Sequence, residues 1–275
     1  MVDWLQQTFQ ENSILWLVLS SIIGGFIGAS TKFLFDVVLP SRVQQGREVI
    51  AIKRKYASPL LLSANSLRER FQNIIKHIEL IEKENWFHRQ DGLDYYHKST
   101  LFVVGQFFGW VQILRRNIAH LDFSTTKETK KFERFLNAIE GGFTDPGLYV
   151  KSKTGIPQHS QDKWVYKFIL QSLGALMITH DEQGFRIMDY AAFCKLFDGT
   201  EGEEFKNWFS HLAEIFKGLK SDDIRLKRII AIHTILNAFI DYLDTKHLQT
   251  EKQIYYWELL NEQEKLKIET IIANI

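Results

Sequence analysis

The chain lacks the residues that a disulfide framework or a thiolate zinc site requires. Its 275 residues include a single cysteine, Cys194, so no disulfide can form within the chain. Zinc sites built on several thiolates are excluded for the same reason. One free cysteine agrees with a reducing compartment. Because the thiol lies in the apolar sequence AAFCKLF, we interpret it as a small core residue rather than a nucleophile.

Proline and net charge are also scarce. The chain has four prolines and 21 phenylalanines, which favours a well-packed helical body. Its 34 basic and 33 acidic residues nearly balance, which argues against a protein that binds nucleic acid through a broad basic face. We therefore expect no nucleic-acid partner.

Common catalytic and cofactor motifs are absent as well. The sequence contains neither the GxxxxGK[ST] nor the GxGxxG phosphate-binding loop, and neither GxSxG nor HExxH. Histidines and aspartates surround one turn at spacings that match no metal site: His88, Asp91, Asp94 and His97. His233 shares a predicted helix with Asp241 and Asp244 and is expected to face neighbouring side chains or water. The sequence thus predicts no cofactor and no metal, and it favours a non-enzymatic protein while leaving catalysis open.

One segment carries no charge over twenty residues, from Asn12 to Thr31. A helix of that length covers roughly the 30 Å hydrocarbon core of a bilayer. We predict a transmembrane helix over 12–36; a buried core helix and a cleaved signal peptide are the alternatives. No basic residue precedes this segment and several follow it, so the positive-inside rule places residues 1–11 outside and the remainder in the cytoplasm.

Two features of this region indicate possible contacts of the anchor. Small residues recur every four positions along the segment, which lets membrane helices approach closely, although such residues are common in membrane helices anyway. They form two strips: Ser20, Gly24 and Gly28, and Ser21, Gly25 and Ala29. Basic residues follow that could contact anionic lipid or only fix the topology: Arg42, Arg47, Lys53, Arg54 and Lys55.

The remainder of the chain predicts an all-α fold of about seven helices with one small β-hairpin near residues 175–193. Apolar residues recur at steps of four and three from Leu60 to Ile81, which indicates a helix that begins at Ser58-Pro59 and packs into a bundle or pairs with a second copy. A further helix is expected to stop at Gly141-Gly142. The predicted divisions after the anchor are a basic connector over 37–57, a helical lobe over 58–141, a loop or linker over 142–160 and a second helical lobe over 161–275.

One pattern leaves an enzymatic alternative open. Arg115 and His120 have the spacing R-x4-H, which resembles the signature of HEPN-type ribonucleases. The resemblance implies that His120 would act as acid or base and Arg115 would stabilise a phosphate. The usual polar residue after the arginine is displaced here, since Asn117 lies one place late. The alternative reading is a helix end where both side chains meet the helix dipole.

Two segments carry a second resemblance. The start Tyr56 to Leu61, the core Gly105 to Trp110 and the following Leu114 to Arg116 are similar to motifs of a group of uncharacterised bacterial single-span membrane-anchored proteins. The group has no assigned activity. The resemblance implies a helical domain anchored in the bacterial cytoplasmic membrane and carries over no catalytic residue.

These observations lead to three functional hypotheses. The first is a membrane-anchored helical binding or scaffold protein at the cytoplasmic face, whose partners are the lipid bilayer and either further copies of itself or another membrane or cytoplasmic protein. The second is a membrane-tethered HEPN-like ribonuclease or toxin-like effector that uses Arg115 and His120. The third is an effector that perturbs the membrane through its oligomerised anchor.

Overall fold

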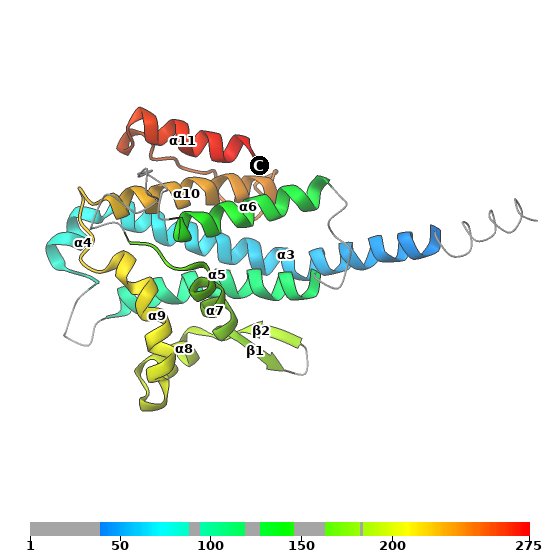
Figure 1. The fold of residues 1–275 in the computed structure, drawn as a ribbon, viewed down its shortest axis with the longest axis horizontal. Coiled ribbons are helices and arrows are strands. Elements are labelled where there is room, and N and C mark those ends of the chain that lie inside the picture. Colours follow the sequence, from blue (N-terminus) through cyan, green and yellow to red (C-terminus); the bar gives the residue numbers. More distant parts are fainter. Residues whose placement is uncertain (1–38, 88–93, 119–126, 146–162, 182–183) are drawn as a thin grey trace, which may run out of the picture. The chain divides into compact units, whose positions relative to one another are not determined.

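Figure 1 shows a computed structural model of the protein, which describes residues 39–87, 94–118, 127–145, 163–181 and 184–275. The predicted transmembrane helix over 12–36, with its two strips of small residues, lies outside these ranges. Over the described ranges, no helix has both the length and the apolar character needed to cross a bilayer. The anchor and its orientation therefore stay predictions.

The described residues confirm a mainly helical fold with one small antiparallel hairpin. They contain nine α-helices rather than the seven expected, because the helix predicted up to Glu84 is broken near His77 and a helix after the hairpin was missed. The helices are α3 (Leu39–Lys76), α4 (Ile78–Glu84), α5 (Tyr95–Ile118), α6 (Lys127–Thr144), α7 (Lys167–Leu176), α8 (Tyr190–Asp198), α9 (Glu203–Phe216), α10 (Ile224–Leu243) and α11 (Glu262–Ala273). The strands are β1 (Ile178–Asp181) and β2 (Gly184–Ile187), paired with Ile178 opposite Ile187.

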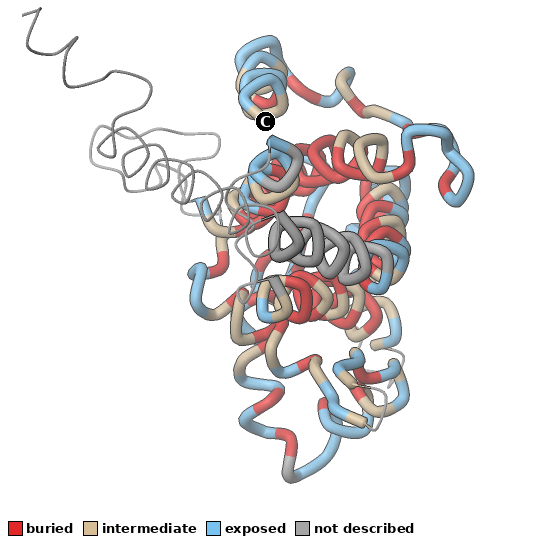
Figure 2. Tube along the Cα trace, turned by 90° about the vertical axis from the view of Figure 1, so that its right-hand side faces the viewer, coloured by how far each residue is buried: buried red, intermediate tan, exposed pale blue. Residues whose placement is uncertain are grey.

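Residues 53–275 form one compact unit. Within it, α11 lies over α10 on one side, while α8 and the hairpin lie on the opposite side (Figure 1). The buried stretches of the helices face one another across the interior, as Figure 2 shows. Packing does not follow the predicted division into two lobes, because α6 packs against α10 and α5 packs against α7 and α9.

The apolar seam of α3 and α4 lies entirely in the core. Its members are all buried: Leu60, Ala64, Leu67, Phe71, Ile74, Ile78 and Ile81. The Phe71 ring lies 6.0 Å from that of Phe143 on α6 and 6.3 Å from that of Phe216 on α9. A seam that is already covered by the chain's own helices does not pair with a second copy, so its coiled-coil alternative is removed.

The charge-free middle of α5 is the centre of the bundle. Most of its apolar residues are buried, with Val103 and Trp110 half-buried, and α5 packs against α7. Glycines on both helices permit this contact. A Cβ atom at Gly109 would lie 3.3 Å from the carbonyl oxygen of Gly174, and one at Gly174 would lie 2.6 Å from that of Phe108. The two backbones therefore touch where these helices cross.

Several predicted helix boundaries were wrong. Ser58-Pro59 does not begin a helix, since α3 runs continuously from Leu39 through Pro59; packing of the seam outweighs the hydrogen bond that proline cannot donate. The predicted connector over 37–57 is thus helical from Leu39 onward. Gly141-Gly142 does not end α6, because Gly142 lies against α10, where a Cβ would be 2.5 Å from Ile232.

Ser221 precedes two aspartates, a pattern that predicts a helix cap at the serine, but the start of α10 differs. Asp223, not Ser221, is the N-cap, and its carboxylate accepts a hydrogen bond from the Arg225 N–H at 2.8 Å. Ser221 instead donates from its backbone N–H to Glu82 at 3.0 Å. The amphipathic pattern predicts a last helix from about Glu251, but α11 begins at Glu262 with a capping box on Asn261. The preceding residues form an irregular segment with a 3-10 helix at Trp257–Leu259, and its contacts with α10 define the site.

Candidate functional site

We call residues 250–261, which lead into α11, the C-terminal segment. Polar side chains gather between α3, α10 and this segment. Within the part of the chain that the structure describes, seven buried side-chain nitrogen and oxygen atoms have no hydrogen-bond partner, and all seven belong to this place. They are Arg68 Nε, both imidazole nitrogens of His233, Asn237 Oδ1, Asp241 Oδ1, Gln253 Oε1 and the Tyr256 hydroxyl. We call these six residues the polar cluster.

Three of the six cluster residues lie on α10, and helical spacing places them on one face. His233, Asn237 and Asp241 lie four residues apart, so they follow one face of the helix. The C-terminal segment crosses that face. The Asn237 side-chain amide donates to the Ile254 carbonyl at 2.7 Å, and the Tyr255 hydroxyl donates to Asp241 at 3.4 Å. These two bonds hold the segment in register while leaving one oxygen of each α10 side chain unpartnered.

Arg68 brings a positive charge to the cluster from α3. Its side chain is 3% exposed. The terminal nitrogen Nη2 donates to Asn65 at 2.9 Å and lies 3.3 Å from the Glu69 carboxylate, which is 58% exposed. Nε has no partner in the described chain. The guanidinium is thus buried with only a solvent-facing carboxylate to balance it.

His233 is fully buried and faces neighbouring side chains, which is the first of the two surroundings that the sequence predicted. Burial, and to a lesser degree the charge of Arg68, lowers the pKa of its imidazole to about 3. Its ring lies 5.4 Å from that of Tyr256. Burial also raises the pKa of the Tyr256 hydroxyl, so this group stays protonated as a hydrogen-bond donor.

Unpartnered atoms of this kind carry a large energetic cost. A buried polar group without a partner costs about 1–3 kcal/mol, so seven of them would cancel much of the 5–15 kcal/mol that stabilises a typical domain. The cluster therefore requires polar atoms beyond those that the described residues supply, which is the property of a hydrated or ligand-binding site.

Of the two residues in the proposed HEPN-like pair, the structure describes only Arg115. Arg115 Nη1 donates to Glu140 at 3.0 Å, and Nη2 donates to Asn137 at 3.1 Å. Glu140 is buried and also accepts from Gln171 at 3.0 Å. Arg115 therefore ties α5 to α6 and α7, while His120 lies outside the described residues.

This arrangement predicts a structural role for Arg115. Arg115→Ala leaves the buried Glu140 with fewer partners and is expected to lower the free energy of unfolding by about 1–2 kcal/mol. The exposed neighbour supplies the control, since Arg116→Ala is expected to stay within about 0.5 kcal/mol of the parent. Urea denaturation of the three proteins measures both. Full stability of Arg115→Ala together with loss of RNA cleavage would favour the ribonuclease hypothesis.

The other sequence candidates lie apart from the cluster. Among the basic residues predicted to meet lipid, the side chain of Lys55 is described; it is exposed, with Nζ 5.3 Å from the Tyr56 ring centre. His97 packs against the rings of Phe87 and Phe197, and Asp94 pairs with Lys98 at 2.9 Å. His88 and Asp91 lie outside the described residues. No group of three metal-ligating side chains occurs in the described ranges.

Cys194 on α8 is half-buried. Burial raises the pKa of the Tyr190 hydroxyl, and a hydrogen bond with this thiol raises it further. The thiol thus packs beside a tyrosine at the edge of the core, in partial agreement with the small core residue that the sequence predicted.

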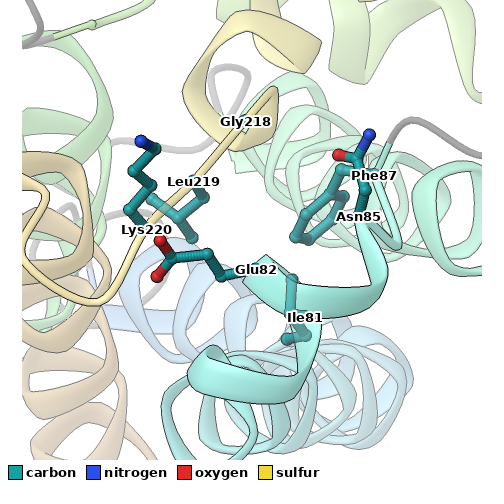
Figure 3. Close-up of a pocket in the computed structure, with 7 residues that line it drawn as sticks. All are labelled: Ile81, Glu82, Asn85, Phe87, Gly218, Leu219 and Lys220. Atoms are coloured by element: carbon teal, nitrogen blue, oxygen red, sulfur yellow. The ribbon is translucent and has the colours of Figure 1, made fainter.

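A small pocket of about 110 Å³ opens between α4 and the turn that joins α9 to α10 (Figure 3). Its lining residues are Ile81, Glu82, Asn85, Phe87, Gly218, Leu219 and Lys220. The Glu82 carboxylate already accepts from the Ser221 backbone and hydroxyl at 3.0 and 3.2 Å. The volume holds about three or four water molecules, at roughly 30 Å³ each. We interpret the pocket as a packing gap between two turns.

Exposed aromatic side chains form a separate surface feature at the start of α7. Phe168 is 80% exposed and Tyr166 is 65% exposed, and the Trp164 ring lies 6.5 Å from that of Tyr166. Lys163 and Lys167, both exposed, flank them. We call these five residues the aromatic face.

No known protein family, curated protein or solved structure matches this chain. The resemblances drawn from its sequence therefore stay predictions. Sequence reasoning named His233 and Asp241 but missed the other members of the cluster, because no spacing pattern links α10 to α3, more than 160 positions earlier, or to the irregular C-terminal segment. The missed residues are Arg68, Asn237, Gln253 and Tyr256.

Proposed function

We propose that the protein is a membrane-anchored helical binding protein that engages an acidic protein partner through the aromatic face. The observation that carries this proposal is the exposure of Tyr166 and Phe168 in a chain whose described phenylalanines are otherwise mostly covered. Large exposed aromatic groups that cluster on a surface are typical of interaction sites.

The aromatic face is held in place by the core beneath it. Val165 is buried, and its N–H donates to the Phe143 carbonyl of α6 at 2.9 Å. Because side chains alternate along an extended segment, anchoring Val165 turns Trp164 and Tyr166 outward. A preorganised aromatic surface loses little conformational entropy when a partner binds.

The charge of this surface selects the partner. Lys163 and Lys167 add two exposed positive charges beside the rings; Lys167 Nζ lies 3.8 Å from the Glu140 carboxylate, whose side chain is buried. A partner with acidic residues around an apolar or aromatic anchor is complementary to this arrangement.

The membrane part of the proposal rests on the sequence. The uncharged stretch from Asn12 to Thr31 and the basic residues after it support a single span with the helical unit in the bacterial cytoplasm. Binding is favoured over catalysis because Arg115, the leading catalytic candidate, is engaged by Glu140 and Asn137.

The test replaces the two most exposed aromatic side chains. We expect Tyr166→Ser with Phe168→Ser to abolish a defined hetero-complex recovered from native membranes, with unchanged thermal unfolding, because few of the removed atoms pack in the core. Leu266→Ser is the matched control, since Leu266 on α11 is also 65% exposed. Crosslinking followed by mass photometry measures the complexes.

Two outcomes would contradict the proposal. The first is a complex that survives the double substitution, and the second is a complex lost equally in the Leu266→Ser control. Differently tagged copies of the chain, expressed together, distinguish a hetero-complex from self-association. If only tagged copies of the chain recover one another, the protein self-associates and the partner proposal fails.

A further inference from the structure

Three hydrogen-bond donors of the polar cluster lie close together. Arg68 Nε, a nitrogen of His233 and the Tyr256 hydroxyl are buried and lack partners among the described residues. The His233 and Tyr256 rings are 5.4 Å apart, and the charge of Arg68 acts on both groups. The carboxylate of Glu258 also acts on Tyr256, but Glu258 is exposed to solvent. The three donors come from α3, α10 and the C-terminal segment, so the fold, and not one local motif, brings them together.

The charge of this group is unbalanced. A buried cation that lacks a buried counter-charge is strongly destabilising. Glu69 approaches only Nη2 of Arg68, from the solvent side, and it also accepts from the Asn65 amide at 2.8 Å. Asp241, the carboxylate of the polar cluster, lies two turns of α10 beyond His233 and accepts a hydrogen bond from Tyr255. The side of the guanidinium that carries Nε therefore favours a negatively charged oxygen.

We propose that Arg68, His233 and Tyr256 form a binding site for a small oxyanion, either a carboxylate or inorganic phosphate, beneath the C-terminal segment. An anionic oxygen satisfies the guanidinium and both neighbouring donors with charge-assisted hydrogen bonds. Water satisfies their hydrogen-bonding capacity but leaves the charge of Arg68 unbalanced. Asn237 Oδ1, one helical turn away, accepts a hydrogen bond from water that accompanies the anion.

The C-terminal segment provides a route for the anion. The helix that follows it, α11, buries only Ile268 and is held to α10 by the ion pair of Lys227 with Glu264 at 2.7 Å. An element with few buried apolar contacts opens at low free-energy cost. Opening the segment exposes Tyr256 and His233 to solvent, and closure then brings the Tyr256 hydroxyl onto the anion.

The proposal is independent of the aromatic face and is tested on the full-length protein. Calorimetric titrations use sodium acetate and sodium phosphate, with sodium chloride at equal ionic strength as the reference. We expect saturable binding of acetate or phosphate and an upward shift of the unfolding temperature, because a ligand that binds only the folded state stabilises it. Binding of acetate would identify the oxyanion as a carboxylate, and binding of phosphate would identify it as inorganic phosphate.

Substitutions locate the site. Tyr256→Phe removes one donor and is expected to weaken binding about tenfold or more, and Arg68→Met is expected to abolish it. Tyr95→Phe is the matched control, because Tyr95 is an exposed tyrosine on α5 outside the polar cluster; the affinity of this variant should equal that of the parent. Since Arg68→Met could disturb folding, Tyr256→Phe alone decides the result.

The proposal is overturned if acetate, phosphate and chloride give the same response, which would mean that water alone fills the cluster. It is also overturned if an anion binds with equal affinity to the parent and Tyr256→Phe, which would place the anion elsewhere on the protein. The anion test does not depend on the aromatic face, so loss of the hetero-complex in the aromatic-face variant neither supports nor overturns the anion site.

Discussion

Gly174→Ala is expected to lower the free energy of unfolding by about 3 kcal/mol. A Cβ at this position would lie 2.6 Å from the carbonyl oxygen of Phe108 and 2.7 Å from its carbonyl carbon. Both atoms belong to the backbone of α5 and cannot move aside as a flexible side chain would. The substitution therefore separates α5 from α7 at their closest approach. Urea denaturation followed by circular dichroism measures the change.

The control for this prediction is the same substitution at a helical position that has no close neighbour. A Cβ at Gly141 of α6 would meet nothing within 4 Å. Gly141→Ala is expected to stabilise the protein by about 0.5–1 kcal/mol, because alanine loses less backbone entropy in a helix. If both alanines shift stability in the same direction, the close crossing of α5 and α7 at Gly174 is wrong.

Acidification from pH 7.5 to pH 5 is expected to cost about 2 kcal/mol of stability through His233 alone. Its pKa is lowered from 6.5 to about 3 in the folded protein, by burial and by the Arg68 charge. Between these values the unfolded chain binds a proton that the folded chain does not. The contribution is therefore complete above pH 6.5 and is lost progressively as the pH falls toward 3.

The measurement compares unfolding at the two pH values in the parent and in His233→Leu, in a buffer without small oxyanions. The pH dependence of the parent should exceed that of His233→Leu by about 2 kcal/mol. His211→Gln changes an exposed histidine on α9 and should behave as the parent does. Equal pH dependence in all three proteins would show that His233 is solvated or protonated in the folded state.

Much of the fold followed from periodicity. The seam from Leu60 to Ile81 and the hairpin at residues 178–187 were predicted correctly, because each is a local pattern that its surroundings reinforce. The errors occurred at glycine, proline and cap residues. Pro59 and Gly142 are helical since tertiary packing outweighs their local preference, and α11 begins late because the C-terminal segment is needed to cover α10.

The candidate site was predicted only in fragments. The spacing of His233 and Asp241 on one helix was visible, but nothing in the sequence showed that both contribute buried atoms to one cluster. Arg68 reads as an ordinary helical arginine until α10 and the C-terminal segment enclose it. Likewise, Phe168 reads as a core residue among 21 phenylalanines, and only the packing of α7 leaves it exposed.

The sequence by itself determined the helical class, the charge-free segment that predicts an anchor, and the absence of common catalytic motifs, because each depends on composition or on neighbours within a few turns. Tertiary structure alone decided which polar groups are buried together and which aromatic groups remain outside. Burial and charge balance depend on contacts between residues far apart in the chain, such as Arg68, His233 and Tyr256, and no local pattern encodes those contacts.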